Sequence, residues 1–93
     1  MTATMRDRRL DKRIDIALPI FLDDAIGITR DVSRTGVFFW TDRTYDLGES
    51  ISFSMGRRTE SEEFVLKCRG VVFRTEPNGL DVGVAVRITD QSS

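Results

Sequence analysis

Two short motifs contain the side chains best suited to chemistry in this sequence. The first is an RxxxR motif with Arg9 and Arg13, and the second is a DxSxxG motif with Asp31, Ser33 and Gly36. A guanidinium group binds phosphate oxygens in pairs, matches the adjacent O6 and N7 acceptors of guanine and stacks on the face of the base. A carboxylate suits the N–H donors on the opposite edge of guanine. These residue types therefore fit a ligand that carries phosphates and guanine bases.

A strand hairpin between the motifs would bring them together. Residues 14–22 alternate apolar and other side chains, and the alternation resumes over 26–31 after a tight turn. If these two segments pair, the start of the first strand lies beside the end of the second, and Arg13 becomes a neighbour of Asp31. Pro19 lacks an N–H group, which predicts an edge or a bulge in its strand.

Strand periodicity dominates the rest of the chain. Gly70 interrupts an alternating run and predicts a bulge, the Leu-Gly pair that ends the loop at 42–49 predicts a turn, and Pro77-Asn78-Gly79 predicts a hairpin turn. Residues 56–62 read as a polar connection. The strands expected after the second motif span residues 37–41, 50–55, 64–74 and 80–88.

About six short strands and no long helix predict an all-β fold, and a six-stranded antiparallel β-barrel would leave no exposed edge. The expected organisation is a flexible basic arm over residues 1–13, the barrel over 14–88 and a polar tail over 89–93. The arm has a net charge of +3 and the remainder −4, which indicates a local anionic partner. From charge alone, a merely solvated tail is an equally good interpretation.

Composition argues against several classes of protein. The 93 residues contain no histidine and one cysteine, which removes the commonest general base and any cysteine cluster for zinc. No phosphate-binding glycine loop is present, so we expect a stand-alone binding module rather than an enzyme, without metal or cofactor. No apolar run is long enough to span a membrane, and the lone Cys68 favours a reducing cytoplasm.

Each motif residue also has a purely structural interpretation. Asp31 and Ser33 could form a turn that caps a strand, and Gly36 could serve close backbone approach or a positive φ. Arg34 inside the second motif could contact phosphate, but an exposed turn residue is the better interpretation. Trp40 is better explained as core or barrel face than as a base-stacking residue. Cys68 falls on the apolar side of its strand and is expected to be buried.

The order of the two motifs around a hairpin resembles the signature of the PilZ family, small bacterial β-barrels that bind cyclic di-GMP. The resemblance covers about residues 8–88 and includes Gly70-Val71-Val72 and Val82-Gly83-Val84. It implies that Arg9 and Arg13 bind phosphates and guanine edges, that Asp31 and Ser33 hydrogen-bond a guanine, and that Gly36 leaves room for the ligand. Val86 stands where the family often has phenylalanine, and the C-terminal helix of many members is missing from this sequence.

Arg8 directly precedes the first motif. Family members with a basic residue there tend to bind two intercalated cyclic di-GMP molecules, so the resemblance implies two ligands per chain and adds Arg8 to the site. The leading hypothesis is a cytoplasmic bacterial receptor whose arm closes over the ligand and changes its surface for a downstream protein. The alternatives are a PilZ-like adaptor without ligand and a small barrel that binds single-stranded nucleic acid, against which the acidic body argues.

Overall fold

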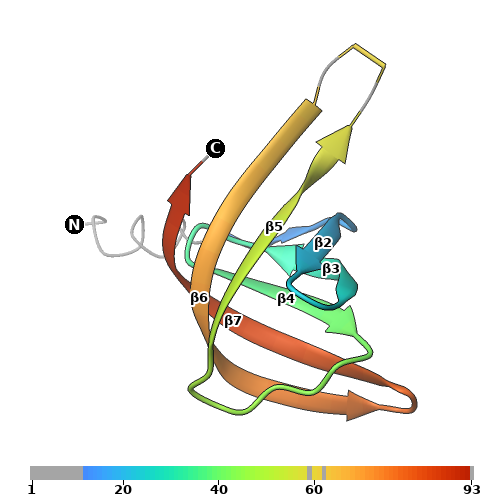
Figure 1. The fold of residues 1–93 in the computed structure, drawn as a ribbon, viewed down its shortest axis with the longest axis vertical. Helices are drawn as coiled ribbons and strands as arrows, with labels where there is room; N and C mark the ends of the chain where they lie inside the picture. Colours follow the sequence, from blue (N-terminus) through green and yellow to red (C-terminus); the bar gives the residue numbers. More distant parts are fainter. Residues whose placement is uncertain (1–11, 59, 62, 93) are drawn as a thin grey trace, which may run out of the picture.

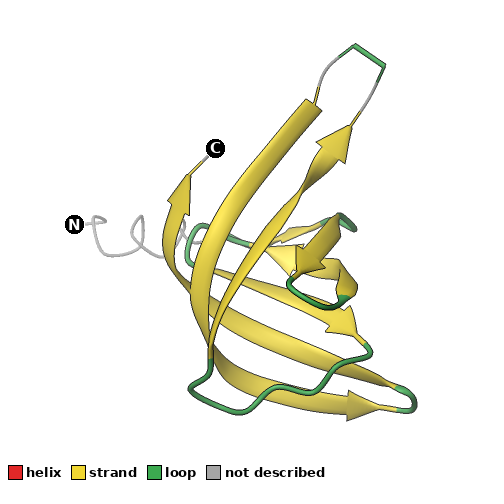
Figure 2. Ribbon diagram, viewed as in Figure 1, coloured by secondary structure: helices red, strands yellow, loops and turns green. Residues whose placement is uncertain are grey.

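Every regular element in the described part of the chain is a β-strand (Figure 2). The computed structural model describes residues 12–58, 60, 61 and 63–92. The strands are β1 (Ile14–Asp15), β2 (Pro19–Leu22), β3 (Ile26–Val32), β4 (Gly36–Thr41), β5 (Ser50–Arg58), β6 (Glu63–Asn78) and β7 (Asp81–Ser92). A helix able to cross a membrane is not found among these residues.

Six of the strands close into a barrel (Figure 1). Neighbours pair antiparallel in the order β3–β2–β5–β6–β7–β4, and β4 pairs back with β3. β1 lies outside this ring, beside the end of β3. The predicted six-stranded antiparallel barrel is therefore confirmed, with one additional short strand. The β5–β6 hairpin projects beyond the ring, because β2 pairs only with residues 53–55 of β5 (Figure 1).

One face of each long strand fills the barrel interior. Side chains alternate along a strand, so Val37 and Phe39 of β4 join the core while Phe38 between them faces outward. The Phe39 ring lies 6.4 Å from the Phe53 ring across the interior. Burial of this apolar surface is the main force that holds the barrel together. The core also contains Ile20, Tyr45, Ile51, Met55, Cys68, Val72, Val84 and Val86.

The first predicted strand is divided in two. Alternation predicted a continuous strand over residues 14–22, but residues 16–18 separate β1 from β2. The buried Thr29 of β3 bridges the gap: its Oγ1 accepts a hydrogen bond from the Leu18 N–H at 2.8 Å and donates one to the Ile16 carbonyl at 2.5 Å. The Thr29 N–H also donates to the Leu18 carbonyl at 2.9 Å. A threonine side chain thus replaces regular ladder bonds before the proline that begins β2.

Two irregularities bend the long β6–β7 pair. The register shifts between Arg69 and Gly70 and again between Val72 and Arg74. A Cβ at Gly70 would lie 2.5 Å from the Arg87 carbonyl oxygen, so the two backbones can approach only because this residue has no side chain. An irregularity does lie at Gly70, as predicted, but its extra residue is Thr89 of β7, while the extra residue of β6 is Phe73, three positions later. The two bulges let the pair curve around the barrel.

Strand ends differ from the prediction where the side chains are polar. β7 continues through the expected tail to Ser92, because Lys67–Arg69 of β6 pair with residues 90–92. β5 likewise extends to Arg58, into the polar connection expected at 56–62, and β6 begins at Glu63, one residue before the expected strand. Backbone pairing needs no apolar side chain, so hydrophobic alternation does not mark these ends.

The two turns predicted from glycine are confirmed. Gly79 has φ 64° in the β6–β7 hairpin, and Gly48 has φ 88° near the end of the loop before β5. Both angles lie in the left-handed region, where a side chain would be strained.

Alkaline pH is expected to destabilise the fold through Cys68 and Tyr45. Burial in the core raises the pKa of the Cys68 thiol above its ordinary value of 9.0, and burial also raises the pKa of Tyr45. The folded state therefore holds these protons more tightly than the unfolded chain, and the free energy of unfolding should fall as the pH rises above about 9. Urea unfolding near neutral pH and at about pH 9.5 would measure the loss. Cys68→Ala should reduce this pH dependence, and an unchanged dependence would contradict the thiol's role.

Candidate ligand-binding site

Arg13 and Asp31 form the centre of the candidate site. β1 pairs with the end of β3, with Ile14 opposite Val32, so Arg13 lies on the outside of the barrel near Asp31. The Arg13 Nη1 donates to the Asp31 Oδ1 at 2.6 Å. The sequence prediction that these two residues are neighbours is confirmed, although the strand that carries Arg13 is only two residues long.

A bulge in β3 adds a second arginine to Asp31. Thr29 pairs with Phe39 and Asp31 with Phe38, so Arg30 is the extra residue. Its Nε donates to the Asp31 Oδ2 at 2.7 Å, and its guanidinium carbon lies 3.9 Å from the centre of the Phe38 ring. The Asp31 side chain is only 5% exposed, yet both of its oxygens are held by arginines that are about half exposed. A buried carboxylate needs such partners.

The second half of the DxSxxG motif forms the β3–β4 turn. The Ser33 N–H donates to the Gly36 carbonyl at 2.8 Å, and the Gly36 N–H donates to the Ser33 Oγ at 3.2 Å. A Cβ at Gly36 would lie 2.9 Å from the Val86 carbonyl oxygen. Gly36 therefore serves close backbone approach, and the alternative of a positive φ is wrong. In this structure the hydroxyl of Ser33 stabilises the turn, as the structural interpretation of the motif proposed.

Two residues outside both motifs, Arg30 and Phe38, lie beside Asp31, and Arg74 of β6 lies over the Phe38 ring. Phe38 is only 1% exposed although it faces outward, since the guanidinium groups of Arg30 and Arg74 lie over its ring. The Arg74 guanidinium is 5.7 Å from the ring centre. Strict alternation along β4 could have identified Phe38 as an outward residue. The hairpin turn predicted at residues 77–79 gives the register that places Arg74 opposite Ala85, since the pairing runs without a shift from Asn78 to Arg74.

Arg34 and Trp40 match their structural interpretations. Arg34 is exposed in the β3–β4 turn. Trp40 is half-buried on the outer face of the barrel, and its ring packs edge-on against Phe38 with centres 5.1 Å apart. A Cβ at Gly83 would lie 2.8 Å from the Trp40 ring, so the absence of a side chain on β7 allows this ring to pack there.

Arg8 and Arg9 lie outside the described residues, so the structure places only Arg13 of the first motif. The described members of both motifs meet at one end of the barrel wall formed by β1, β3 and β4. Phosphate and base contacts from Arg13, Arg30 and Arg74 are chemically available there, with Asp31 as the acceptor for paired N–H donors.

Comparison with known families identifies this arrangement. The family description "PilZ domain" matches residues 5–93, nearly the whole chain. The chain belongs to the PilZ family. PilZ domains are receptor or adaptor domains rather than enzymes. A comparison with curated proteins found no match.

The PilZ fold is also seen in the Bacillus subtilis inhibitor of motility, MotI/DgrA. The two structures superpose with a TM-score of 0.75 and 16% sequence identity, over 92% of this chain. This PilZ domain spans 44% of the length of that protein. At this identity the likeness establishes the fold.

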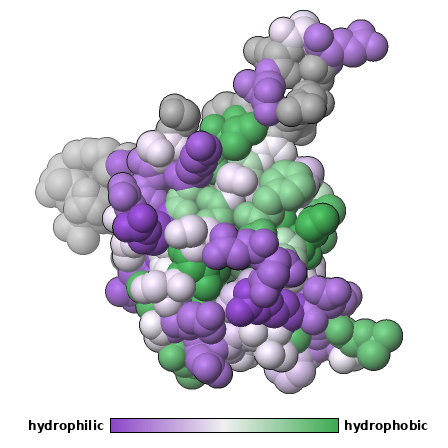
Figure 3. Space-filling model, viewed as in Figure 1, coloured by the Kyte–Doolittle hydropathy of each residue, from purple (hydrophilic) through white to green (hydrophobic). Residues whose placement is uncertain are grey.

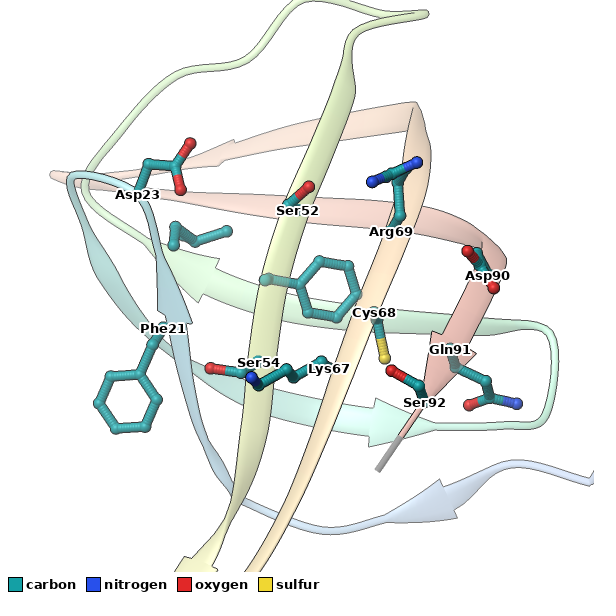
Figure 4. Close-up of a pocket in the computed structure, with 12 residues that line it drawn as sticks. Phe21, Asp23, Ser52, Ser54, Lys67, Cys68, Arg69, Asp90, Gln91 and Ser92 are labelled. Carbon is teal, nitrogen blue, oxygen red and sulfur yellow. The ribbon is translucent and has the colours of Figure 1, made fainter.

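One surface cavity lies away from the two motifs. It has a volume of about 430 Å³ and is bordered by β2, β5, β6 and the end of β7 (Figure 4). Its outward side chains are mostly polar, including Ser52, Ser54, Lys67 and Arg69, and the Phe21 ring stands at its edge (Figure 4). None of its lining residues belongs to either motif.

Proposed function

We propose that this PilZ domain is a cyclic di-GMP receptor whose site consists of Arg8, Arg9, Arg13, Asp31, Ser33 and Gly36. The observation that carries the proposal is the 2.6 Å contact between Arg13 and Asp31, which joins the two motifs across the β1–β3 pair. The family match over residues 5–93 supports the ligand class.

Binding would proceed by exchange of partners at Asp31. Both carboxylate oxygens now accept hydrogen bonds from Arg13 and Arg30. The N1–H and N2–H donors of a guanine can replace a guanidinium there, which frees that arginine to bind a phosphate or the O6/N7 edge of a base. The exchange keeps the buried carboxylate satisfied throughout, and the ligand's phosphates compensate the released positive charge.

The arm of residues 1–13 would then close over the ligand. Arg8 and Arg9 would contact the side of the ligand that faces away from the barrel. Closure would change the surface around β1 and β3 that a downstream protein meets. Such ordering of one segment by a ligand is a common way to switch a protein between two states.

An adaptor function without ligand is the second candidate. It is favoured by the fact that the motif side chains already have structural tasks. Asp31 is paired with two arginines and the Ser33 hydroxyl stabilises a turn. These contacts alone would explain why the motif residues are present.

Isothermal titration calorimetry with cyclic di-GMP is expected to show saturable binding at two molecules per chain. Arg8→Ala should reduce the stoichiometry to one, because the third guanidinium offsets the phosphate charge of the second molecule. Arg6→Ala is the matched control, since it removes one arm charge outside the motif, and it should keep two.

The outcomes separate the hypotheses. Saturation of the unaltered chain at one ligand would refute the intercalated pair but keep the receptor. No binding of cyclic di-GMP by a folded chain would favour the adaptor. Binding of mixed single-stranded oligonucleotides with a steep salt dependence would instead support a nucleic-acid-binding barrel.

A further inference from the structure

The outer side of β2 and β3 is apolar. Phe21 is 50% exposed, Ile26 67% and Ile28 48%. Phe21 pairs with Ile26 and Pro19 with Ile28, so these four side chains form two adjacent rows on one face of the sheet. Ile28 also lies opposite Trp40 of β4. We call Pro19, Phe21, Ile26, Ile28 and Trp40 the β2–β3 face.

The fold does not require apolar side chains at these positions. The inward positions beside them belong to Ile20, Gly27 and Thr29. In the row of Phe21 the outward positions on β5 and β6 carry Ser54 and Lys67, and in the row of Pro19 they carry Gly56 and Val65. Figure 3 shows hydrophobic surface gathered over the β2–β3 region, and Figure 4 shows the Phe21 ring projecting away from the sheet. A contiguous exposed apolar patch on a small domain marks an interaction site.

One end of the face is acidic. Asp23 and Asp24 form the β2–β3 turn beyond Phe21, and Asp42 follows the β4 residue that pairs with Gly27, next to Ile26. Arg43 pairs with Asp24 and offsets one of these charges. The remaining negative charge favours a partner that brings lysine or arginine to this end.

We propose that the β2–β3 face docks a cationic amphipathic helix of a partner protein. Adjacent strands lie about 5 Å apart, so a face three strands wide accommodates one helix of about 10 Å diameter. Apolar side chains of the helix pack against Phe21, Ile26 and Ile28, and its basic end reaches the aspartates. A stable dimer needs about 20–30 residues from each chain, far more than this face provides, so a second copy is the weaker occupant.

Docking at the β2–β3 face does not depend on cyclic di-GMP, although the face adjoins the candidate ligand site. Trp40 at the border packs on Phe38, which carries the Arg30 guanidinium of the candidate ligand site. Trp40 is the only tryptophan of the chain, so its fluorescence reports on the face directly.

Two synthetic helical peptides with the same leucine face test the proposal, one flanked by lysines and the other by glutamates. Each is titrated into the full chain while Trp40 fluorescence and backbone amide chemical shifts are followed. We expect the lysine peptide to bind at least about tenfold more tightly than the glutamate peptide, with shifts concentrated on β2 and β3.

Ile28→Ser should weaken binding of the lysine peptide about tenfold or more. Phe73→Ser is the matched control, because Phe73 is 47% exposed on β6, which pairs with neither β2 nor β3, and it should leave binding unchanged. Ile26→Ser provides a second variant if Ile28→Ser alters the thermal unfolding of the chain.

Three results would overturn the proposal. One is equal affinity for both peptides, and another is shifts centred away from β2 and β3. The third is a concentration-dependent dimer, seen in sedimentation experiments and abolished by Ile28→Ser. The β2–β3 face would then be the interface between two copies of this chain.

Discussion

Arg13→Ala is expected to weaken cyclic di-GMP binding at least about 30-fold while the barrel stays folded. A charge-assisted hydrogen bond is worth about 2–3 kcal/mol, which corresponds to this loss of affinity or more. The fold should tolerate the change because the Arg13 side chain is 56% exposed and Arg30 continues to pair with Asp31. The buried Asp31 carboxylate keeps its Oδ2 partner, so the barrel should stay folded although loss of the Oδ1 partner lowers its stability.

Calorimetry of the variant measures the affinity, and thermal unfolding checks the fold. Arg69→Ala is the matched control, since it removes the same charge from an outward position of β6 that lies outside both motifs. Binding by Arg13→Ala as tight as by the control would show that the RxxxR motif does not hold the ligand.

Thr29→Val is expected to lower the free energy of unfolding by about 2–4 kcal/mol. Valine has nearly the same shape but no hydroxyl, so the Leu18 N–H and the Ile16 carbonyl would lose their hydrogen-bond partner at a residue that is 2% exposed. Each buried polar group left unsatisfied costs about 1–3 kcal/mol. Urea unfolding followed by circular dichroism measures the difference.

Thr89→Val is the control for this change. The Thr89 hydroxyl also donates to a backbone carbonyl, that of Arg69 at 3.1 Å, but it is exposed, so water can take its place. Its effect should stay within about 0.5 kcal/mol. Equal losses in the two variants would mean that the bridge across the gap between β1 and β2 has no special role.

The sequence predicted the parts of the fold that depend on alternation and turn chemistry. Pairing of the segments around residues 14–31 correctly placed Arg13 beside Asp31, and Gly70 marked a register shift, although the extra residue there is Thr89 of the partner strand. The extra residue at Arg30 was not predictable, because a bulge in β3 depends on how β4 pairs with it. That bulge decides that Asp31 has two arginine partners rather than one.

The sequence also did not predict which apolar residues of β3 would face outward. The sequence shows Ile26 and Ile28 as an alternating apolar set, which normally indicates the buried side of a strand. The structure buries Thr29 and leaves both isoleucines outside, because Thr29 is needed at the gap before β2. Alternation identified the strand but not which of its sides faces the core.

The attachment of β1 has a consequence for the speed of response. Two residue pairs and the Thr29 bridge hold this strand and the residues after it to a barrel that is closed without it. Release of β1 is therefore a local opening, which needs far less free energy than global unfolding. The proposed exchange of partners at Asp31 would then proceed on the timescale of a short segment, while the barrel keeps the remaining motif residues in place.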